Sequence, residues 1–338
     1  MSAASSLRVF STCPPSITAS AEAYLAQVEE IASWSEDAGC EGILVYTDNS
    51  QVDAWLVSQT IIGATRSLCP LVAVQPAYMH PYSVAKMVAS LAFLHSRRVY
   101  LNMVAGGFAN DLAALDDRTP HDQRYERLIE YTTIVQQLLE SEEPVTFNGT
   151  HYRVKNLRLT PRVPRALLPG ILISGSSEAG MAAAMRLGAT AIEYPKPAAD
   201  CLAAEVPTAA SRGIRIGIIA RSADAEAWRV AHARFPPDRH GQLAHELAMK
   251  VSDSAWHRQL SALGETPAGA NNPYWLVPFK NYKTFCPYLV GSYSRVAHAI
   301  AGYVQAGYRT FVLDVPAGAE ELRHIGAAFG AAGDSLAA

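Results

Sequence analysis

The sequence has few of the features that mark secreted, membrane-bound or disulfide-rich proteins. Its five cysteines are odd in number and scattered, with no C-x-x-C pair, so reduced thiols are expected. No basic segment followed by an apolar run opens the chain, so no signal peptide is predicted. No apolar stretch is long enough to cross a bilayer. We therefore expect a cytoplasmic protein. The cysteines are Cys13, Cys40, Cys69, Cys201 and Cys286.

An excess of charge of one sign is also lacking. The chain carries 28 Lys and Arg against 31 Asp and Glu, which gives a net charge of −3. This balance argues against nucleic acid or an anionic membrane as a partner. The ten histidines are scattered without an H-E-x-x-H motif, and neither a G-x-S-x-G elbow nor a Walker loop occurs. We expect no metal site, no hydrolase built on that elbow and no P-loop.

Apolar runs and segments with helical spacing alternate along all 338 residues. Eight strands, each followed by a helix, predict an α/β protein folded as a (β/α)8 TIM barrel, with an open doubly wound sheet as the alternative. We expect one domain spanning residues 1–338. The predicted strands lie at 9–10, 43–46, 71–74, 99–104, 171–173, 191–192, 214–220 and 310–315.

Two insertions interrupt the alternation. Residues 145–154 alternate in polarity around Asn148-Gly149, a strong signal for a β-hairpin after the fourth barrel helix. Residues 264–292 are too long for an ordinary connection, and they are too aromatic for a disordered one. We expect this loop to form a lid over the barrel mouth, and a packed surface loop or subunit contact is the alternative. Its aromatic residues include Tyr274, Trp275, Phe279, Tyr282 and Phe285.

The active site of such a barrel lies at the carboxyl ends of its strands. There, Ser174-Gly175-Ser176-Ser177-Glu178 joins a predicted strand to a helix. Free N–H groups at the helix start, the positive end of the helix dipole and the hydroxyls suit a phosphate. The alternative is a plain helix N-cap. Gly175, Ser176 and Ser177 are therefore candidate phosphate ligands.

Two more groups of residues fall at this end of the barrel. Asn102, Ala105 and Gly106 end a strand in a turn of small residues, which lets a cofactor approach the backbone closely or merely forms a tight turn. His121 and Tyr125 lie four apart and share a helix face. They are candidates to line the cofactor site, with Tyr125 favoured. Arg124 and Arg127 offer a competing phosphate clamp.

These motifs, taken in order with Asp53-Ala54-Trp55-Leu56-Val57, resemble the bacterial-luciferase-like flavin monooxygenases, and the alkanesulfonate branch above all. The resemblance covers about residues 7–330. It implies FMN, reduced by a separate flavin reductase, with the phosphate held by the glycine-serine-serine stretch and Asn102 bordering the flavin. It also implies oxygen chemistry on a small organic substrate in a closed, dry pocket, and a homodimer.

Several positions depart from the alkanesulfonate pattern. Gln51 stands where that branch has a cysteine and Gly217 where it has a histidine. In the last predicted strand, the chain reads Leu313-Asp314-Val315-Pro316 where that branch has glycine-tyrosine. Arg215 survives as a candidate cationic residue, and the mobile-loop arginine falls near Tyr282 or Lys283. Because most of the expected groups are missing, an alkanesulfonate is not the expected substrate.

Asp314 and Glu193 fall near strand ends, where carboxylates would suit an amine. This favours N-oxygenation as a hypothesis, unless both residues cap loops or pair with Arg215 or Arg221. The candidate catalytic residues are Arg215, Asp314, Glu193 and Gln51. Two other readings stay open: a deazaflavin (F420)-dependent oxidoreductase, and a flavin-binding relative without catalysis.

Overall fold

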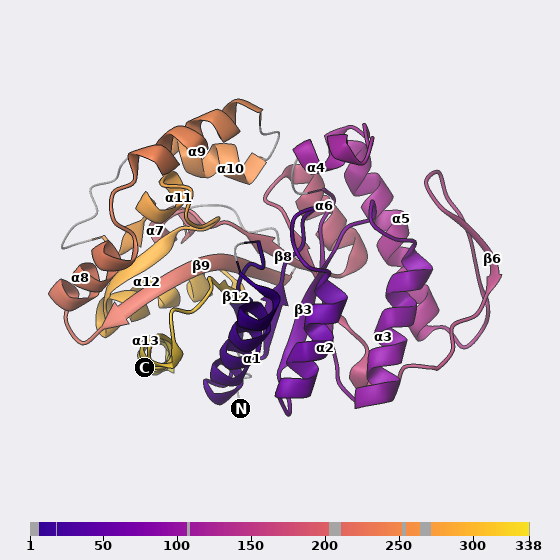
Figure 1. Cartoon of the computed structure of the whole chain (residues 1–338), viewed down its shortest axis with the longest axis horizontal. Coiled ribbons are helices and arrows are strands. Elements are labelled where there is room, and N and C mark those ends of the chain that lie inside the picture. Colours follow the sequence, from indigo (N-terminus) through magenta and orange to yellow (C-terminus); the bar gives the residue numbers. More distant parts are fainter. Residues whose placement is uncertain are drawn as a thin grey trace.

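The computed structural model describes residues 7–17, 19–106, 109–202, 211–251, 255–263 and 272–337. Eight parallel strands pair in the order β1, β2, β3, β4, β7, β8, β9 and β12, and β12 returns to β1. This closed barrel, with helices around it (Figure 1), confirms the predicted (β/α)8 fold. The strands are β1 (Arg8–Thr12), β2 (Gly42–Val45), β3 (Cys69–Val74), β4 (Tyr100–Met103), β7 (Gly170–Ser174), β8 (Thr190–Glu193), β9 (Ser211–Arg221) and β12 (Tyr308–Leu313).

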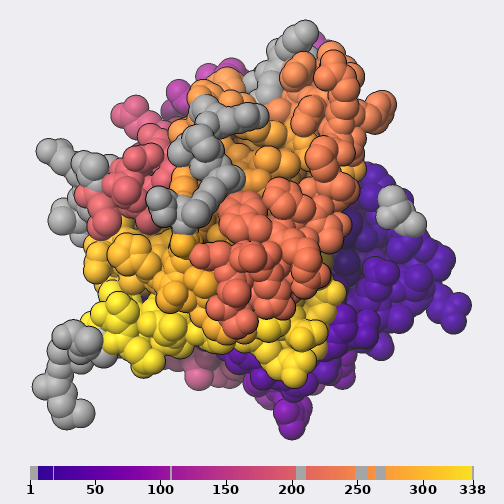
Figure 2. All heavy atoms as spheres, turned by 90° about the vertical axis from the view of Figure 1, so that its left-hand side faces the viewer, coloured from indigo at the N-terminus to yellow at the C-terminus, as the bar shows by residue number. Residues whose placement is uncertain are grey.

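Helices follow the strands and cover the outside of the barrel. Figure 2 faces the side away from the hairpin and shows the last third of the chain, orange to yellow, covering it. No described helix is long and apolar enough to span a membrane. The helices are α1 (Ala21–Asp37), α2 (Ala54–Ala64), α3 (Pro81–His95), α4 (Ala109–Ala114), α5 (His121–Glu140), α6 (Glu178–Leu187), α7 (Ala198–Leu202), α8 (Asp224–Arg234), α9 (Arg239–Val251), α10 (Ala255–Ala262), α11 (Val277–Lys280), α12 (Tyr293–Gln305) and α13 (Ala319–Ala337), with a 3₁₀ turn at Arg165–Leu167.

Side chains from seven of the barrel strands fill its interior. The rings of Phe10 and Tyr100 meet edge to face at 5.1 Å in this cluster. A Cβ on Gly170 would lie 2.4 Å from the ring of Tyr100, so β7 needs glycine there to pass the ring. The inner cluster therefore closes the barrel below the pocket described next. Its members are Phe10, Leu44, Leu71, Tyr100, Leu172, Ile192 and Val312.

The predicted hairpin is present as β5 (Val145–Asn148) and β6 (Arg153–Leu157), joined at Asn148-Gly149. It projects beside α5 (Figure 1). Its tip is fastened to α5 by Glu130, whose carboxylate accepts hydrogen bonds from the backbone N–H groups of residues 150–152 at 2.8–3.0 Å. The hairpin is therefore held at its tip by a charged acceptor.

The second predicted insertion is more regular than expected. β10 (Tyr274–Trp275) pairs antiparallel with β11 (Tyr288–Ser292), and β11 runs parallel to the last five residues of β9. Trp275 and Phe279 are buried in the outer core. The prediction of a loop is thus wrong for the described part of this insertion. Its aromatic residues pack in the core, and its short apolar strand β11 pairs with β9. Residues 264–271 of the predicted lid lie outside the described residues.

A half-buried carboxylate also links α1 to the loop before β3, which gives a stability prediction. Glu36 accepts hydrogen bonds from the backbone N–H groups of Arg66, Ser67 and Leu68. Burial raises the pKa of Glu36, but these hydrogen bonds outweigh it and lower the pKa to about 2. Because the folded pKa lies below the unfolded value of 4.5, this stabilisation is complete above pH 4.5 and is lost as the pH falls toward 2.

We expect Glu36→Gln to lower the free energy of unfolding at pH 7 by about 1–2 kcal/mol. The gap to the unmodified protein should narrow as urea unfolding is repeated from pH 7 down to pH 3. Glu29→Gln, an exposed change on the same helix, should leave the urea midpoint unchanged. Equal midpoints for Glu36→Gln and the unmodified protein at pH 7 would contradict the assignment.

Candidate cofactor and substrate site

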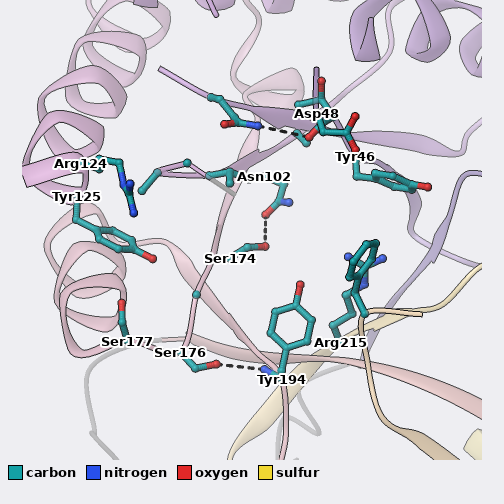
Figure 3. A pocket seen from close by; sticks show the side chains of 18 of the residues that line it. Tyr46, Asp48, Asn102, Arg124, Tyr125, Ser174, Ser176, Ser177, Tyr194 and Arg215 are labelled. Atoms are coloured by element: carbon teal, nitrogen blue, oxygen red, sulfur yellow. Dashed lines mark hydrogen bonds between the residues drawn. The ribbon is translucent and has the colours of Figure 1, made fainter. Parts of the chain in front are cut away.

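A hollow of about 1000 Å³, open to solvent, lies at the carboxyl ends of the strands. The side chains and backbone that line it come from the ends of β2, β3, β4, β7, β8 and β9 and from the start of α5, as Figure 3 shows in part. Of the twelve predicted site residues, nine line it: Asn102, Ala105, Gly106, His121, Tyr125, Gly175, Ser176, Ser177 and Arg215.

One end of the pocket is formed by the turn from β7 into α6. Ser177 caps α6, and its Oγ accepts a hydrogen bond from the N–H of Gly180 at 3.1 Å. The Oγ of Ser176 accepts from the N–H of Tyr194 at 3.3 Å. Because both oxygens act as acceptors, each hydroxyl keeps its proton to donate. The helix start therefore presents hydroxyl donors and the positive end of its dipole to the pocket.

α5 adds a phenol and a guanidinium to this end of the pocket. Tyr125 and Arg124 are both buried, and Figure 3 shows them beside Ser176 and Ser177. Gly175 has φ +152°, and a Cβ there would lie 2.5 Å from the Tyr125 hydroxyl. Glycine is thus required at this position both for its backbone conformation and for the space that the phenol takes. A cation, a phenol, hydroxyls and a helix N-terminus together suit a phosphate.

The rival clamp residue and the predicted histidine lie differently. Arg127 forms an ion pair with Asp117 at 2.6 Å and does not line the pocket. Arg124, which the sequence offered only as part of a rival clamp, does line it. His121 lines the pocket too, but its Nδ1 lies 2.7 Å from the Asp122 carboxylate and its ring stacks edge-on to Tyr125. Arg124 and Tyr125 are accordingly the stronger phosphate candidates.

The middle of the pocket is lined by small and polar groups. Ser174 donates its hydroxyl to Oδ1 of Asn102 at 2.8 Å (Figure 3). This bond fixes the buried amide with its N–H groups left to donate. Ala73, Val104 and Ala105 add small apolar surface. The combination of a fixed amide donor with a small apolar wall suits a flat, polar ring system.

The opposite side of the pocket holds Arg215, Tyr194, Tyr46 and Phe285 (Figure 3 labels the first three). Nε of Arg215 is buried and has no hydrogen-bond partner among the described residues. Burial lowers the pKa of Arg215, but the neighbouring Tyr194, Cys286 and Asp314 raise it more, so the pKa ends above its ordinary value. A permanent cation therefore stands at this wall, where an anionic ring or substrate group would be stabilised.

Three predicted catalytic residues do not line the pocket. Glu193 forms an ion pair with Arg212 at 2.8 Å. Asp314 accepts hydroxyl hydrogen bonds from Thr284 at 2.6 Å and Tyr288 at 2.7 Å. Both acids therefore have hydrogen-bond or ion-pair partners, but neither forms an ion pair with Arg215 or Arg221, the two arginines expected from the sequence. The side-chain oxygen of Gln51 accepts from the backbone N–H of Ser16 at 2.8 Å and from its hydroxyl at 3.0 Å, which fastens two loops together.

Gly217 stands where the alkanesulfonate branch has a histidine, and the structure explains its lack of a side chain. A Cβ on Gly217 would lie 2.3 Å from the ring of Tyr288. The phenol from β11 thus occupies the space beside β9, and its hydroxyl reaches Asp314. A histidine would not fit at position 217 without displacing Tyr288.

The residues present fit a flavin phosphate better than a metal. Within the described ranges, no group of three or more His, Cys, Asp or Glu side chains could hold a metal ion. The orphaned Nε of Arg215 and the Gly175 cradle against Tyr125 are both features that a bound organic anion would use. Tyr46, Asp48 and Gln75 also line the pocket. Their positions at strand ends mark them as rim candidates in the sequence, but no motif gives them a role there.

Sequence comparison matches the chain to a known family and to a characterised relative. A family model described as luciferase-like monooxygenase matches residues 7–310. The chain is 33% identical over 307 residues to the 4-(gamma-L-glutamylamino)butanoyl-[BtrI acyl-carrier protein] monooxygenase BtrO of Niallia circulans, which covers 89% of each sequence.

Solved structures share the fold at low identity. Riboflavin lyase (RcaE), solved with modified FMN and riboflavin, superposes with a TM-score of 0.76 at 16% identity, over 97% of this chain and 92% of that one. EDTA monooxygenase from Chelativorans sp. BNC1 gives 0.69 at 15%, over 98% and 95%. An F420-dependent secondary alcohol dehydrogenase gives 0.66 at 16%, over 97% and 98%. At these identities the likeness is one of fold.

The contact between Gly175 and Tyr125 gives a binding prediction. Gly175→Ala places a methyl group against the Tyr125 hydroxyl and strains the turn, so we expect FMN affinity to fall about tenfold or more, or by at least ~1.4 kcal/mol. Fluorescence titration of FMN measures this change. Tyr125→Phe introduced into the same variant removes the atom that clashes, and it should recover part of the loss. Unchanged affinity in Gly175→Ala would rule out this turn as the phosphate cradle.

Proposed function

Because the chain belongs to the luciferase-like monooxygenase family and is a flavin-dependent monooxygenase, we propose that its cofactor is FMN, reduced by a separate flavin reductase. The observation that carries this proposal is one end of the pocket, whose residues suit a phosphate. There, Arg124, Tyr125, Ser176 and Ser177 meet the N-terminus of α6. We further propose that the protein acts as a homodimer on a small organic substrate.

In this proposal the pocket residues bind and orient the flavin and keep water out. Bound reduced FMN would supply the electrons that activate oxygen. Asn102, fixed by Ser174, would donate hydrogen bonds to the ring system, and Arg215 would balance its negative charge. Phe285 is the one predicted lid aromatic that lines the pocket, and it would shield the reacting region from solvent.

Two substrate classes are disfavoured because the residues that would recognise them are absent from the pocket lining. Kinship with the alkanesulfonate branch is proposed for fold and cofactor only, because Tyr288 fills the space beside Gly217. N-oxygenation guided by Asp314 and Glu193 is not retained, because both carboxylates are bound to partners away from the lining. The relative at 33% identity is named for an acyl group on an acyl-carrier protein, so we propose carrier-bound acyl groups as the first class to assay.

An F420-dependent reaction is the rival activity, since a dehydrogenase that uses F420 shares the fold. Parallel anaerobic titrations with reduced FMN, reduced F420 and reduced riboflavin separate the cases. We expect reduced FMN to bind best. Preference for F420 would replace oxygen chemistry with hydride transfer, and binding of none would favour a non-catalytic protein.

The same titration tests the phosphate assignment. We expect Arg124→Gln to weaken FMN binding about tenfold while it leaves riboflavin binding unchanged, because only FMN carries the phosphate that Arg124 would contact. Arg118→Gln removes an exposed charge from the segment before α5, outside the pocket lining, and should change neither. An equal loss for FMN and riboflavin in Arg124→Gln would contradict a phosphate contact.

A further inference from the structure

The pocket carries one acidic group that the proposed flavin site does not use. Among the described residues that line it, Asp48 has the one carboxylate, against guanidinium groups at Arg124 and Arg215. Asp48 lies in the loop after β2, across the pocket from Ser176 and Ser177 (Figure 3). Its side chain thus faces the same space as the proposed cofactor, but away from the phosphate end.

One oxygen of the Asp48 carboxylate already accepts hydrogen bonds within its own loop. Oδ1 of Asp48 accepts hydrogen bonds from the backbone N–H of Ser50 at 2.8 Å and from the Ser50 hydroxyl at 2.5 Å. Oδ2 accepts none from the described residues, and none of the described Lys, Arg or His side chains forms an ion pair with Asp48. A half-buried carboxylate with one oxygen unused has capacity for a donor that comes from the solvent side.

The loop that presents Asp48 is fixed from two directions. The backbone N–H of Asn49 donates to the carboxylate of Asp111 on α4 at 3.1 Å, and the Asn49 side-chain amide donates to the Asp111 carbonyl at 3.1 Å. The Tyr78 hydroxyl donates to the Asn49 side-chain oxygen at 2.8 Å. Asp48 is therefore held in place before any ligand arrives, which reduces the entropic cost of binding.

The negative charge of Asp48 raises the pKa of two neighbouring phenols. The pKa of Tyr46 is raised to about 12, mainly by burial; Arg215 opposes this rise, and Asp314 and Asp48 add to it. The pKa of Tyr78 is raised to about 12 by burial, with Asp111 and Asp48 adding to it. Both phenols accordingly stay protonated at neutral pH, and neither neutralises the carboxylate.

We propose that Asp48 binds a cationic amino group of the substrate, and that the substrates of this enzyme are therefore amine-bearing molecules. The ammonium is a recognition handle here, and the atom that receives oxygen lies elsewhere on the substrate. This inference rests on the proposed function only in placing substrate and FMN in one pocket. The competing explanation is that Asp48 does no more than cap its own loop through Ser50.

Asp48→Asn separates the two explanations. Asparagine keeps the Oδ1 acceptor for Ser50 and removes the charge, so the loop should persist while ammonium binding is lost. Asp111→Asn is the matched control: it removes a nearby charge outside the pocket lining and keeps an acceptor for Asn49. The probes are hexylamine and hexan-1-ol, which differ in charge at one end, titrated by calorimetry in the presence of FMN.

We expect the unmodified protein to bind hexylamine about tenfold more tightly than hexan-1-ol, Asp48→Asn to lose this preference, and Asp111→Asn to keep it. A preference that persists in Asp48→Asn, or no preference in the unmodified protein, overturns the proposal. FMN affinity is measured in the same samples. In the unmodified protein, FMN binding without an amine preference counts against the role of Asp48 alone, whereas an amine preference without FMN binding counts against the proposed cofactor alone.

Discussion

The pairing of β9 with three other strands is the constraint on which the rest of the molecule depends. Its first residues pair with β8 and β12 and close the barrel. Its last five residues run past that seam and pair with β11. Closure brings the carboxyl ends of the strands to one rim, which is why residues as distant in sequence as Tyr46 and Arg215 share a pocket. Without β9, the barrel rim that forms the pocket would not close, and β11 of the insertion would have no strand to pair with on that side.

A second regularity is the pairing of a glycine with a tyrosine ring. Gly170 makes room for Tyr100, Gly175 for Tyr125 and Gly217 for Tyr288. In each case a large ring from one element fills the space that the glycine leaves on another, as close packing of an interior requires. The three pairs lie in the barrel core, at the phosphate end and behind the wall of Arg215. The same packing device thus serves both folding and the shape of the site.

Most of the barrel and the phosphate end could be predicted from the sequence, because both depend on local signals. Strand and helix periodicity predicted the eight units. Ser176-Ser177 at a helix start predicted an anion site, and the structure places both residues in the pocket lining. Asp53, part of the family resemblance, proves to be the N-cap of α2, a structural role readable from its position alone. Local patterns of this kind survive folding with little change.

What could not be predicted depends on contacts between distant segments. Glu193 stands at a strand end as expected, yet its carboxylate forms an ion pair with Arg212. Asp48 follows a strand in the same way and has no ion-pair partner among the residues that the structure describes. Nothing within either segment distinguishes the two carboxylates, since the difference lies in what packs against them. β11 was missed because prolines and aromatics around it mask a five-residue strand.

The attachment of Asp314 has a consequence for modularity. Its two hydroxyl partners, Thr284 and Tyr288, both belong to the insertion before α12. Asp314 itself follows β12, and its negative charge helps to raise the pKa of Arg215. The insertion therefore cannot be exchanged without changing contacts of the barrel. A chimera that receives this segment from another family member would also exchange the electrostatic support of its arginine. Loop and barrel are thus constrained to evolve together.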